Sequence, residues 1–453
     1  MKKLYIQTYG CQMNHYDSER IAQVMGRANY TLTDEPENAD LILLNTCSVR
    51  DKAEQKVYST LGSWREIKQK KSSVIIGLGG CVAQQEGDRL LKRVAHLDLV
   101  FGTHNIHKLP EMIEQVQSAH ARPVEVAFYR DPSYMEDASG RTHVQGAKAF
   151  VTIMQGCNKV CSFCIVPHVR GREVSRPSER IIAEIRSLVA QGVKEVMLLG
   201  QNVNSYGKRS TAEIHFADLL HRINPIEGLS RIRFTTSHPQ DLSADLIEAY
   251  ATLDKVCEHL HLPVQSGSDS VLLRMRRGYT RNEYLNRIDR LRQRCPDVAL
   301  STDIIVGFPG ETDDDFERTL ELLGQVEYDE IYSFMYSPRT QTISAKLYND
   351  DVLEEKKKER LKQVQNVQQE ISLRKNKQKI GRTEEVLIDG HSRNKAQVMG
   401  RTRANRIVNV IGRGNLIGEM VDARIIAATV NSLVGELVVQ ETASEIQAQG
   451  ETV

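Results

Sequence analysis

The chain has 453 residues, of which 40% are hydrophobic and 26% are charged, an ordinary globular composition that argues against wholesale disorder. At about 150 residues per domain, this length predicts roughly three domains. The 60 basic and 59 acidic residues leave a formal charge of +1, so any surface that binds nucleic acid must be local. Eight cysteines are too few for a disulfide-stapled scaffold.

Two absences in the sequence predict where the protein works. No run of 18 apolar residues occurs, so we expect no membrane span. The first ten residues alternate polar and apolar side chains and lack the continuous apolar core of a secretory signal. We therefore expect a cytoplasmic protein in a reducing compartment, where cysteines more often bind metal or do chemistry than form disulfides.

Residues 1–120 alternate strand-like and helix-like patterns, which predicts an α/β domain with a parallel sheet and helical crossovers. The short apolar runs of three segments read as buried strands, with helical patterns between them. The strands are expected at 4–10, 39–46 and 73–80, and the helices at 18–25 and 54–67.

A cysteine follows each of these three strands: Cys11, Cys47 and Cys81. They are 36 and 34 residues apart, which corresponds to one strand–helix repeat each. Because ligands of open parallel sheets bind beyond the carboxyl ends of the strands, three cysteines at equivalent strand ends are expected to converge in one crevice. Three independent core cysteines are the alternative, since free cysteine is often buried. The repeated topological position favours a shared site.

Residues 121–145 mix proline, glycine, serine and charges without periodicity and are interpreted as a linker. Residues 146–378 then hold six strand-like segments separated by helical patterns, which predicts a full or partial parallel barrel. Its active site is expected at the carboxyl ends of the strands. The strands are expected at 150–155, 195–200, 231–237, 259–264, 299–307 and 330–337.

A helical pattern over residues 353–379 is rich in lysine and arginine, and its simplest interpretation is a solvated helix face. Residues 379–445 then hold five short strand-like segments punctuated by glycines, which predicts a small OB-like barrel. Such barrels often bind single-stranded nucleic acid. Five basic residues on neighbouring turns and strands make RNA binding a hypothesis: Arg393, Lys395, Arg401, Arg403 and Arg406.

The strongest local signal follows the first barrel strand, where Cys157, Cys161 and Cys164 form a C-x3-C-x2-C pattern with no fourth cysteine nearby. A [4Fe–4S] cluster needs four ligands, so three thiolates leave one iron open to an outside ligand. A zinc site completed by His168 is the competing interpretation. A structural zinc site is normally closed and needs no barrel around it, so the position of this loop favours catalysis.

In this position the second triplet resembles the signature of the radical S-adenosylmethionine enzymes. Together with the three N-terminal cysteines and the C-terminal barrel, it makes the whole chain similar to the methylthiotransferases. Residues 9–14 and 156–159 resemble the bacterial and organellar branch, which adds methylthio to carbon 2 of N6-isopentenyladenosine beside the tRNA anticodon; residues 45–47, 79–81 and 170–177 also fit. At Gln12-Met13 the ribosomal-protein branch usually has Pro-Lys, and the threonylcarbamoyladenosine branch usually has Lys-Val.

The resemblance implies a radical S-adenosylmethionine core in the form of a partial (β/α)6 barrel and a C-terminal barrel of the TRAM type. It further implies S-adenosylmethionine and two [4Fe–4S] clusters as cofactors, one held by Cys11, Cys47 and Cys81 and the other by Cys157, Cys161 and Cys164. In this family, one cofactor molecule methylates a sulfur carried on the N-terminal cluster. A second generates the 5′-deoxyadenosyl radical that takes hydrogen from the aryl carbon.

Positions at the strand ends suggest contacts to S-adenosylmethionine. Gln201 and Asn202 follow the second barrel strand, Ser237 the third and Gln265 the fourth, while Asp303 lies on the fifth. The alternative is that these polar side chains only satisfy backbone groups. His238 is a weaker candidate for an acid–base group, because radical abstraction of hydrogen needs no side-chain base.

The implied partners are the tRNA anticodon stem-loop, an electron donor such as flavodoxin or ferredoxin, and a sulfur source, and we expect a monomer. Two other hypotheses stay open. The same chemistry could act on threonylcarbamoyladenosine in tRNA or on a ribosomal protein, or the chain could be a metal-stabilised RNA-binding protein without catalysis. Cys257 and Cys295 fit neither triplet and are expected to be core or surface thiols.

Overall fold

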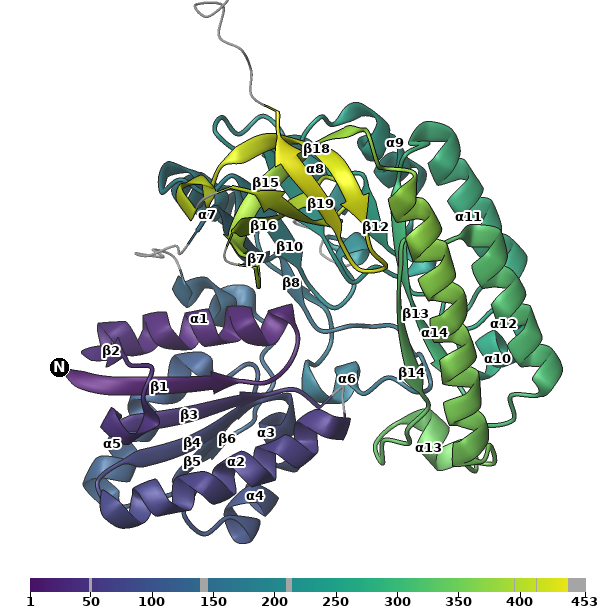
Figure 1. The fold of residues 1–453 in the computed structure, drawn as a ribbon. Coiled ribbons are helices and arrows are strands. Elements are labelled where there is room, and N and C mark those ends of the chain that lie inside the picture. The colour runs from purple at the N-terminus through teal and green to yellow at the C-terminus, as the bar shows by residue number, and fades with distance from the viewer. Residues whose placement is uncertain (49–50, 139–145, 209–213, 395, 413, 439–453) are drawn as a thin grey trace, which may run out of the picture.

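The structure, a computed structural model, describes residues 1–48, 51–138, 146–208, 214–394, 396–412 and 414–438. Three bodies are visible in Figure 1: an α/β domain that contains the N-terminus, a barrel-like domain covered by helices, and a small β-barrel near the C-terminal end. No helix within these residues is long and apolar enough to cross a membrane.

The N-terminal domain is built on a six-stranded sheet in which every pair of neighbours is parallel, with the order β2-β1-β3-β4-β5-β6. The central strands β3 and β4 are fully buried, as their apolar runs predict for a sheet covered on both faces. The strands are β1 (Lys2–Thr8), β2 (Tyr30–Leu32), β3 (Leu41–Thr46), β4 (Ile75–Gly80), β5 (Leu99–Phe101) and β6 (Val124–Glu125).

Helices cover the two faces of this sheet and bury a separate hydrophobic cluster on each. On one face α1 (Gln12–Arg27) and α5 (Leu109–Ala119) supply the apolar side chains, and on the other face α2 (Asp51–Lys70) and α4 (Asp88–Arg93) do. The short helix α3 (Cys81–Glu86) follows β4 directly. The alternating strand and helix patterns of the sequence therefore produced the architecture that they predict.

The structure differs from the linker expected over residues 121–145. Residues 124–125 form β6, the edge strand of the N-terminal sheet, and the 3-10 helix η3 (Pro132–Ala138) buries Tyr134 and Met135. Backbone pairing thus joins residues 124–125 to the N-terminal sheet, while Tyr134 and Met135 pack with Val174 of the second domain. Residues 139–145 lie outside the described residues.

Six parallel strands form the second domain as a partial barrel, in two sheets of three with the orders β11-β10-β7 and β12-β13-β14. Helices α7 (Ser178–Ala190), α8 (Phe216–Ile223), α9 (Ala244–Thr252), α10 (Asp269–Arg274), α11 (Arg281–Arg294) and α12 (Asp313–Val326) follow the strands in turn. The strands are β7 (Lys148–Thr152), β10 (Glu195–Leu199), β11 (Arg231–Phe234), β12 (His259–His261), β13 (Ala299–Val306) and β14 (Glu330–Met335).

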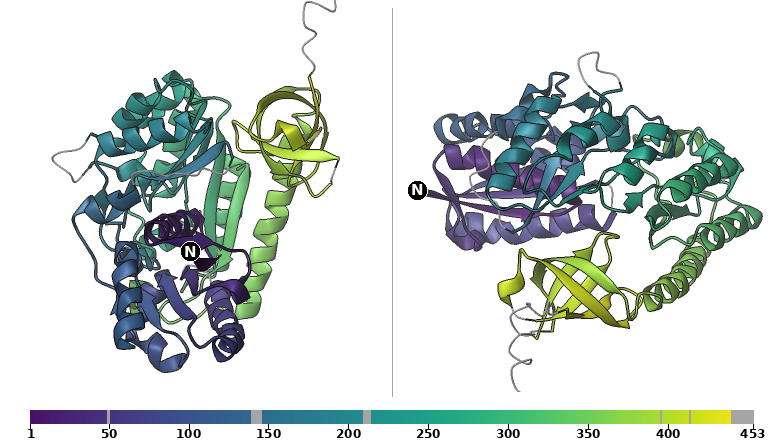
Figure 2. Two further views of the ribbon diagram at one scale, coloured as in Figure 1. Left: turned by 90° about the vertical axis from the view of Figure 1, so that its left-hand side faces the viewer. Right: turned by 90° about the horizontal axis from the view of Figure 1, so that it is seen from above.

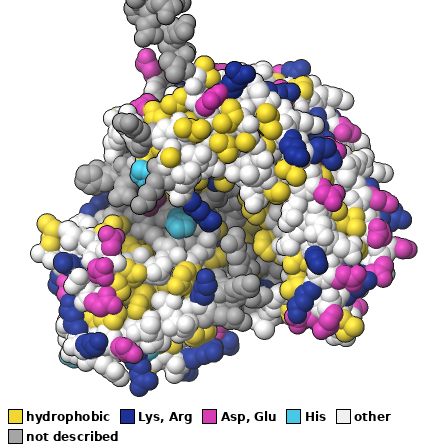
Figure 3. Space-filling view, in the orientation of Figure 1, with side chains coloured by type: hydrophobic (Ala, Val, Ile, Leu, Met, Phe, Trp, Pro, Cys, Tyr) yellow, Lys and Arg dark blue, Asp and Glu magenta, His cyan; other side chains and the backbone are white. Residues whose placement is uncertain are grey.

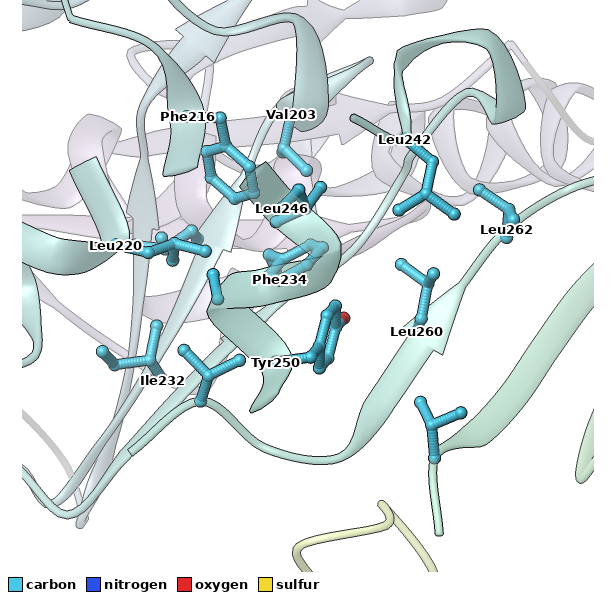
Figure 4. Close-up of a cluster of buried hydrophobic side chains, with 14 of the residues drawn as sticks. Val203, Phe216, Leu220, Ile232, Phe234, Leu242, Leu246, Tyr250, Leu260 and Leu262 are labelled. Carbon is cyan, nitrogen blue, oxygen red and sulfur yellow. The ribbon is translucent and has the colours of Figure 1, made fainter. Parts of the chain in front are cut away.

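The largest hydrophobic core lies between these strands and their helices. Figure 4 shows part of it, where Ile232 and Phe234 of β11 lie among Phe216, Leu246 and Tyr250 of the covering helices. Because side chains alternate along a strand, the residues between them point to the opposite, inner face of the barrel. The polar residues of these strands are therefore directed into the barrel.

A closed five-stranded barrel forms the C-terminal domain, with the strand order β15-β16-β17-β19-β18. Figure 2 shows the long helix α14 (Glu354–Lys377) as an arm that runs alongside the second domain and ends at this barrel. The strands are β15 (Thr383–His391), β16 (Gln397–Thr402), β17 (Ile407–Ile411), β18 (Met420–Ala428) and β19 (Leu433–Leu437).

The sequence had suggested that the basic side chains of helix α14 form a solvated face, but two of them are buried in the structure. Lys357 and Arg360 are 5% and 3% exposed. Lys357 forms an ion pair with Asp350 at 2.5 Å, and Arg360 forms one with Glu311 at 2.7 Å. These carboxylates come from the adjoining loops, so only the tertiary structure shows that this part of the helix is held to the second domain.

Buried arginines on the inner face of β11 join the small barrel to the second domain. Arg231 donates to the Glu385 carboxylate at 2.8 Å and to the Arg401 carbonyl at 2.8 Å. Arg233 donates to the Glu195 carboxylate at 2.9 Å and to the Thr402 carbonyl at 2.6 Å. The C-terminal barrel thus covers the amino-terminal end of the partial barrel on its inner side and leaves the carboxyl ends of the strands open.

Candidate functional site

The first cysteine triplet lies at the carboxyl edge of the N-terminal sheet. Cys11 caps α1 after β1, Cys47 follows β3, and Cys81 begins α3 after β4; these three strands are neighbours in the sheet. The Cys47 thiol interacts with the thiols of both Cys11 and Cys81. Cys47 and Cys81 are buried and Cys11 is exposed, so the group opens to the surface on one side.

Two buried asparagines hold the turns that carry Cys11 and Cys47. The Asn14 side chain accepts a hydrogen bond from the Cys11 amide at 3.3 Å and donates to the Thr46 carbonyl at 3.0 Å. Asn45 donates to the Asn14 carbonyl at 2.8 Å and to the Ser18 hydroxyl at 2.9 Å. Both asparagines lie in the stretches 9–14 and 45–47 that carry the family resemblance, although the sequence alone indicated no role for their side chains.

Glycines precede the cysteines where the backbone leaves little room. Gly80 has φ +90°, and a Cβ atom there would lie 2.4 Å from the Thr46 carbonyl oxygen. Gly156 has φ +83°, and a Cβ atom there would lie 2.1 Å from the Arg172 carbonyl oxygen. Any other residue at either position would have to move the cysteine that follows it.

The second triplet occupies one loop after β8 (Met154–Gln155), and Cys157, Cys161 and Cys164 are all partly buried. The Glu173 carboxylate holds this loop, since it accepts from the Asn158 amide at 3.3 Å and from the Ser205 hydroxyl at 3.0 Å. The loop continues into α6 (Val166–Val169). Its ends are thus fixed by neighbouring elements of the partial barrel.

A buried arginine contacts the second triplet directly. Arg277 donates from Nη1 to the Cys161 sulfur at 3.2 Å, from Nη2 to the Pro263 carbonyl at 2.6 Å, and from Nε to the Tyr279 hydroxyl at 2.9 Å. In the described part of the chain, no carboxylate pairs with this guanidinium. Its positive charge is therefore available to the thiols.

Burial dominates the protonation of the other two thiols of this loop. It raises the pKa of Cys157 to about 11 and that of Cys164 to about 12. Free thiols in this loop therefore stay protonated at neutral pH, whereas a metal bound to them would deprotonate them outright.

His238 stands beside Cys161, with Nε2 at 3.9 Å from its sulfur, while Nδ1 accepts a hydrogen bond from the Gln240 amide at 3.3 Å. Burial, and next the charge of Arg277, hold the pKa of His238 far below its usual range. A histidine kept neutral in this way cannot act as a proton donor at neutral pH, which agrees with the weaker role expected for it.

The electrostatics of the first triplet differ from those of the second. The interaction with Cys47 lowers the pKa of Cys11 to about 6 and that of Cys81 to about 7 against the opposing effect of burial, and the Arg170 charge lowers both further. The same interactions raise the pKa of Cys47. This triplet therefore already contains groups that favour thiolates before any metal is bound.

Three of the five residues expected to contact S-adenosylmethionine share a feature that fits a ligand. Asn202, Ser237 and Gln265 are 1%, 6% and 6% exposed, and each has a side-chain oxygen with no hydrogen-bond partner within the described residues. They follow β10, β11 and β12 at the carboxyl rim of the partial barrel. Because buried polar atoms are rarely left unpaired, this rim fits a polar ligand such as the methionine moiety.

The other two residues expected to contact S-adenosylmethionine, Gln201 and Asp303, already have partners within the protein. The Gln201 side chain accepts a hydrogen bond from the Gly156 amide at 2.5 Å, so it braces the cysteine loop. Asp303 lies on the inner face of β13, where its carboxylate is 3.6 Å from His261 Nε2. Neither side chain belongs to the group of unpaired buried atoms, since each already has a protein partner.

The two triplets are close in space because one segment serves both. Arg170 lies six positions after Cys164 in the chain, so their Cα atoms are at most about 20 Å apart. Helix α6 lies within this segment, and Ile165 and Val169 pack against Cys81. Figure 3 shows the surface hollowed between the N-terminal domain and the second domain.

Zinc is the poorer fit to these cysteines. His168, the proposed fourth ligand, is exposed on α6. Within the described residues, no three His, Cys, Asp or Glu side chains are grouped tightly enough to hold a single metal ion. Thiols that bind different irons of one cluster need not converge on a single point, so a multi-iron cluster suits their spacing better.

The basic residues of the C-terminal barrel are largely engaged inside the protein. Arg403 forms an ion pair with Glu258 at 2.7 Å, Arg406 pairs with Asp329, and Arg401 donates to the Asn405 carbonyl at 3.2 Å. Arg393 is exposed, and Lys395 lies outside the described residues. Arg403 and Arg406 therefore attach this barrel to the second domain and do not form a free basic surface.

Sequence reasoning missed Arg277 and Glu173 as parts of the site and assigned no role to Arg170. A lone arginine far along the chain carries no spacing signal that could connect it with Cys161. Arg170 and Glu173 lie in the stretch 170–177, which fits the family pattern, so their presence was visible but their contacts were not.

Comparisons with known families cover most of the chain. Residues 3–102 match the uncharacterized protein family UPF0004, residues 151–323 match the radical SAM superfamily, and residues 377–438 match the TRAM domain. The chain is 51% identical to the tRNA-2-methylthio-N(6)-dimethylallyladenosine synthase of Geobacter metallireducens, over 97% of this chain and 99% of that protein. It is 49% identical to the enzyme of the same name from Syntrophus aciditrophicus, over 97% and 95%.

A solved structure supports the fold. The radical S-adenosylmethionine methyltransferase TsrM from Kitasatospora setae, with cobalamin and a [4Fe–4S] cluster bound, superposes with a TM-score of 0.55 at 14% identity. The superposition covers 76% of this chain and 77% of that one. At this identity the likeness shows the fold alone.

Proposed function

Because the chain belongs to the family of the tRNA-2-methylthio-N(6)-dimethylallyladenosine synthases, we propose that it adds a methylthio group to carbon 2 of N6-isopentenyladenosine next to the anticodon of tRNA. One observation carries this proposal: the segment that follows the second cysteine triplet packs through Ile165 and Val169 against Cys81 of the first. A transfer of sulfur to a carbon radical requires both centres to reach the same substrate base, and this packing brings the two triplets to one side of the domain interface.

We assign the six cysteines as cluster ligands, Cys11, Cys47 and Cys81 for one [4Fe–4S] cluster and Cys157, Cys161 and Cys164 for the other. Asn202, Ser237 and Gln265 are assigned to S-adenosylmethionine. When bound, these groups supply the radical that takes hydrogen from carbon 2 and the sulfur that replaces it. The chain itself positions them: Glu173 and Gln201 brace the second cysteine loop, and Arg277 offsets the charge of its thiolates.

The inner wall of the partial barrel offers a surface for the substrate base. Ile331 and Ser333 of β14 line a shallow pocket with residues of α14, so Tyr332 and Phe334 face inwards, where they are 40% and 39% exposed. Tyr332 packs edge-on against the ring of His261 at 5.7 Å between centroids. Aromatic rings exposed on a concave wall can stack on a base that has left the anticodon-loop stack.

Phe334 also connects this wall with the second cysteine loop. It pairs across the sheet with Ile305, and Ile305 packs on the same hydrophobic cluster as Phe163 of the loop. An isopentenyl group of five carbons buried here would contribute at most about 4 kcal/mol, at about 0.8 kcal/mol per carbon, and so offset the cost of unstacking the base. A bare adenosine lacks this contribution.

The experiment that tests the function is a competition assay with prenylated and unprenylated anticodon stem-loops, read by the methylthio product. We expect the unprenylated RNA to react at least about a hundredfold less efficiently, which corresponds to about 2.7 kcal/mol. Phe334→Ala should reduce this discrimination more than the rate on unprenylated RNA, whereas a substitution of the exposed Leu273 on α10, Leu273→Ala, should leave it unchanged. Equal turnover of both RNAs would exclude the prenyl pocket and reopen the choice of substrate.

The remaining assignments are proposals of the same kind. We propose an electron donor such as flavodoxin or ferredoxin, a separate sulfur source and a monomeric enzyme. We propose that the boundary between the first and second domains lies later than residue 120, because β6 pairs with β5 of the N-terminal sheet. The third domain extends from residue 379 to 445, of which 439–445 lie outside the described residues.

The second candidate, a metal-stabilised RNA-binding protein, makes different predictions. It requires zinc and no cleavage of S-adenosylmethionine, whereas the proposed enzyme holds iron and cleaves the cofactor under reducing conditions. Iron analysis together with detection of 5′-deoxyadenosine therefore separates the two candidates.

A further inference from the structure

Three successive carbonyl groups of residues 169–171 bind both large domains. The Val169 carbonyl accepts from the Thr103 hydroxyl at 2.8 Å, and the Arg170 carbonyl accepts from His104 Nε2 at 2.9 Å. The Gly171 carbonyl accepts from the amide of Cys157 at 3.1 Å. This strap, residues 169–171, therefore fixes the second cysteine loop to the N-terminal domain.

The side chain of the middle residue enters the N-terminal domain. Arg170 is 2% exposed, and its Nη2 lies 2.7 Å from the Asp17 carboxylate of α1, which is equally buried. Neither Nη1 nor Nη2 makes a well-aligned hydrogen bond among the described residues, so Nη2 meets Asp17 as an ion pair. Val169 packs against Cys81 and the Arg170 side chain reaches the Cys81 thiol, so the guanidinium lies in the wall of the first cysteine site.

A buried ion pair is costly to desolvate and contributes little net stability, so its presence here needs another reason. Arg277 provides a parallel at the second triplet, where the corresponding Nη1 atom donates to a cysteine sulfur. The difference is that Arg170 has a carboxylate partner. The pair thus brings two opposite charges to one side of the first triplet.

On the basis of the proposed function, we propose that Arg170 is a positioning residue for the N-terminal cluster. Its guanidinium places a positive charge and a hydrogen-bond donor beside the sulfur atoms of Cys11 and Cys81. Asp17 supplies the opposite charge. A positive charge beside a cluster favours the reduced state, which carries one more electron, and a negative charge disfavours it. The two side chains therefore act on the reduction potential with opposite signs.

The experiment uses the full-length chain carrying Cys157→Ala, Cys161→Ala and Cys164→Ala, reconstituted without oxygen so that only the N-terminal cluster forms. The reduction potential of this cluster is measured by titration followed by electron paramagnetic resonance. Arg170→Gln should lower the equilibrium constant for reduction at least about tenfold, or 59 mV for one electron. Asp17→Asn should raise it, and the double variant should return close to the parent value.

Two further variants separate charge from structure. Arg170→Lys keeps the charge and should restore most of the potential, while Arg277→Gln, at the other triplet, should not shift the N-terminal cluster. If Arg170→Gln fails to hold iron, the opposite-signed shift of Asp17→Asn and the rescue by lysine still decide the question. Shifts of the same sign for Arg170→Gln and Asp17→Asn, or no shift for either, would overturn the proposal.

Failure of this inference can be told from failure of the proposed function. A wild-type chain that forms the methylthio product while the charge variants leave the potential unchanged overturns the role of Arg170 alone. A chain with the second triplet removed that binds no iron at all overturns the assignment of the N-terminal cluster, and the role of Arg170 falls with it.

Discussion

The two cysteine sites contain the same number of thiols but are assembled in different ways. Cys157, Cys161 and Cys164 come from one loop of eight residues, whereas Cys11, Cys47 and Cys81 come from three neighbouring strands and span 71 residues. The first site therefore depends on correct pairing of the whole N-terminal sheet. The second depends mainly on the turns of its own loop and on the few side chains that brace it.

The two sites also differ in the charged side chains that lie beside their thiols. Each site has one buried arginine, but Arg277 has no carboxylate partner in the described part of the chain, while Arg170 is paired with Asp17. The charge of Arg277 is thus not offset by a paired carboxylate, whereas Asp17 offsets that of Arg170. A centre that must accept an electron and bind a carboxylate benefits from an uncompensated positive charge.

The largest expected effect comes from removing either triplet. Changing Cys157, Cys161 and Cys164 together to alanine should abolish cleavage of S-adenosylmethionine and leave about half of the iron, since we assign one cluster to each triplet. Changing Cys11, Cys47 and Cys81 should also halve the iron and leave cleavage intact. Iron analysis and 5′-deoxyadenosine formation measure the two quantities. Loss of cleavage in a well-folded N-terminal triple variant would contradict this division.

A smaller effect is expected from the uncompensated arginine. Arg277→Met removes a charged hydrogen bond to Cys161 that is worth about 1.5–3 kcal/mol, so cleavage of S-adenosylmethionine should slow by about tenfold to a hundredfold. Arg277→Lys should recover part of the loss. The control is Arg290→Met, an exposed arginine of α11. Unchanged rates in Arg277→Met would show that the charge asymmetry between the sites has no catalytic consequence.

The assembly of the first site can be weakened without touching a cysteine. Asn45→Ala removes two hydrogen bonds that tie β3 to α1, and we expect it to lower the free energy of unfolding by about 1–3 kcal/mol. Iron at the first site should fall while the second keeps its iron. Denaturation curves and iron content check this, with the exposed Asn38→Ala as the matched control. Equal iron loss from both sites would show that they do not assemble independently.

The smallest effect concerns pH and the strap between the sites. Burial lowers the pKa of His104, which donates to the Arg170 carbonyl, to about 4. Between pH 6.5 and about 4 the unfolded chain holds a proton that the folded chain does not, so stability falls as the pH falls. The loss from pH 7 to pH 5 should be about 2 kcal/mol.

His104→Gln keeps a donor without a titrating ring and should flatten this part of the profile. Thermal melting of the metal-free protein at pH 7 and pH 5 measures the difference. A variant whose melting temperature falls as steeply with acid as that of the parent would show that His104 does not cause the loss. It would also leave the strap without a pH-sensitive contact.

Much of the fold could be predicted because strand and helix periodicity is a local property. The pattern of short apolar runs identified β1, β3 and β4 and all six strands of the partial barrel, and the cysteines at their ends followed from parallel topology. The short strands β2, β5 and β6 have two or three residues and no periodic signal. A two-residue strand such as β6 leaves no pattern that could reveal its pairing with β5 or the packing of Val124 on the core.

The candidate site likewise has a part that the sequence predicted and a part that it could not predict. Spacing alone identified both triplets, because ligands on one loop or at successive strand ends repeat in the sequence. It also placed Asn202, Ser237 and Gln265 at the rim, where each has an unpaired buried oxygen. It could not separate them from Gln201 and Asp303, because the partner that occupies a polar side chain is a property of the packed structure.

The sequence by itself thus determined the three-part architecture, the six cysteines and the kind of chemistry, because each is recorded in local patterns and spacings. Only the tertiary structure decided which charges stand beside which thiols. Arg170 reaches Asp17, Arg277 reaches Cys161, and Arg403 reaches Glu258, across 153, 116 and 145 residues of chain. Such contacts leave no periodic trace, since an arginine side chain can meet a partner from any element that packs against it.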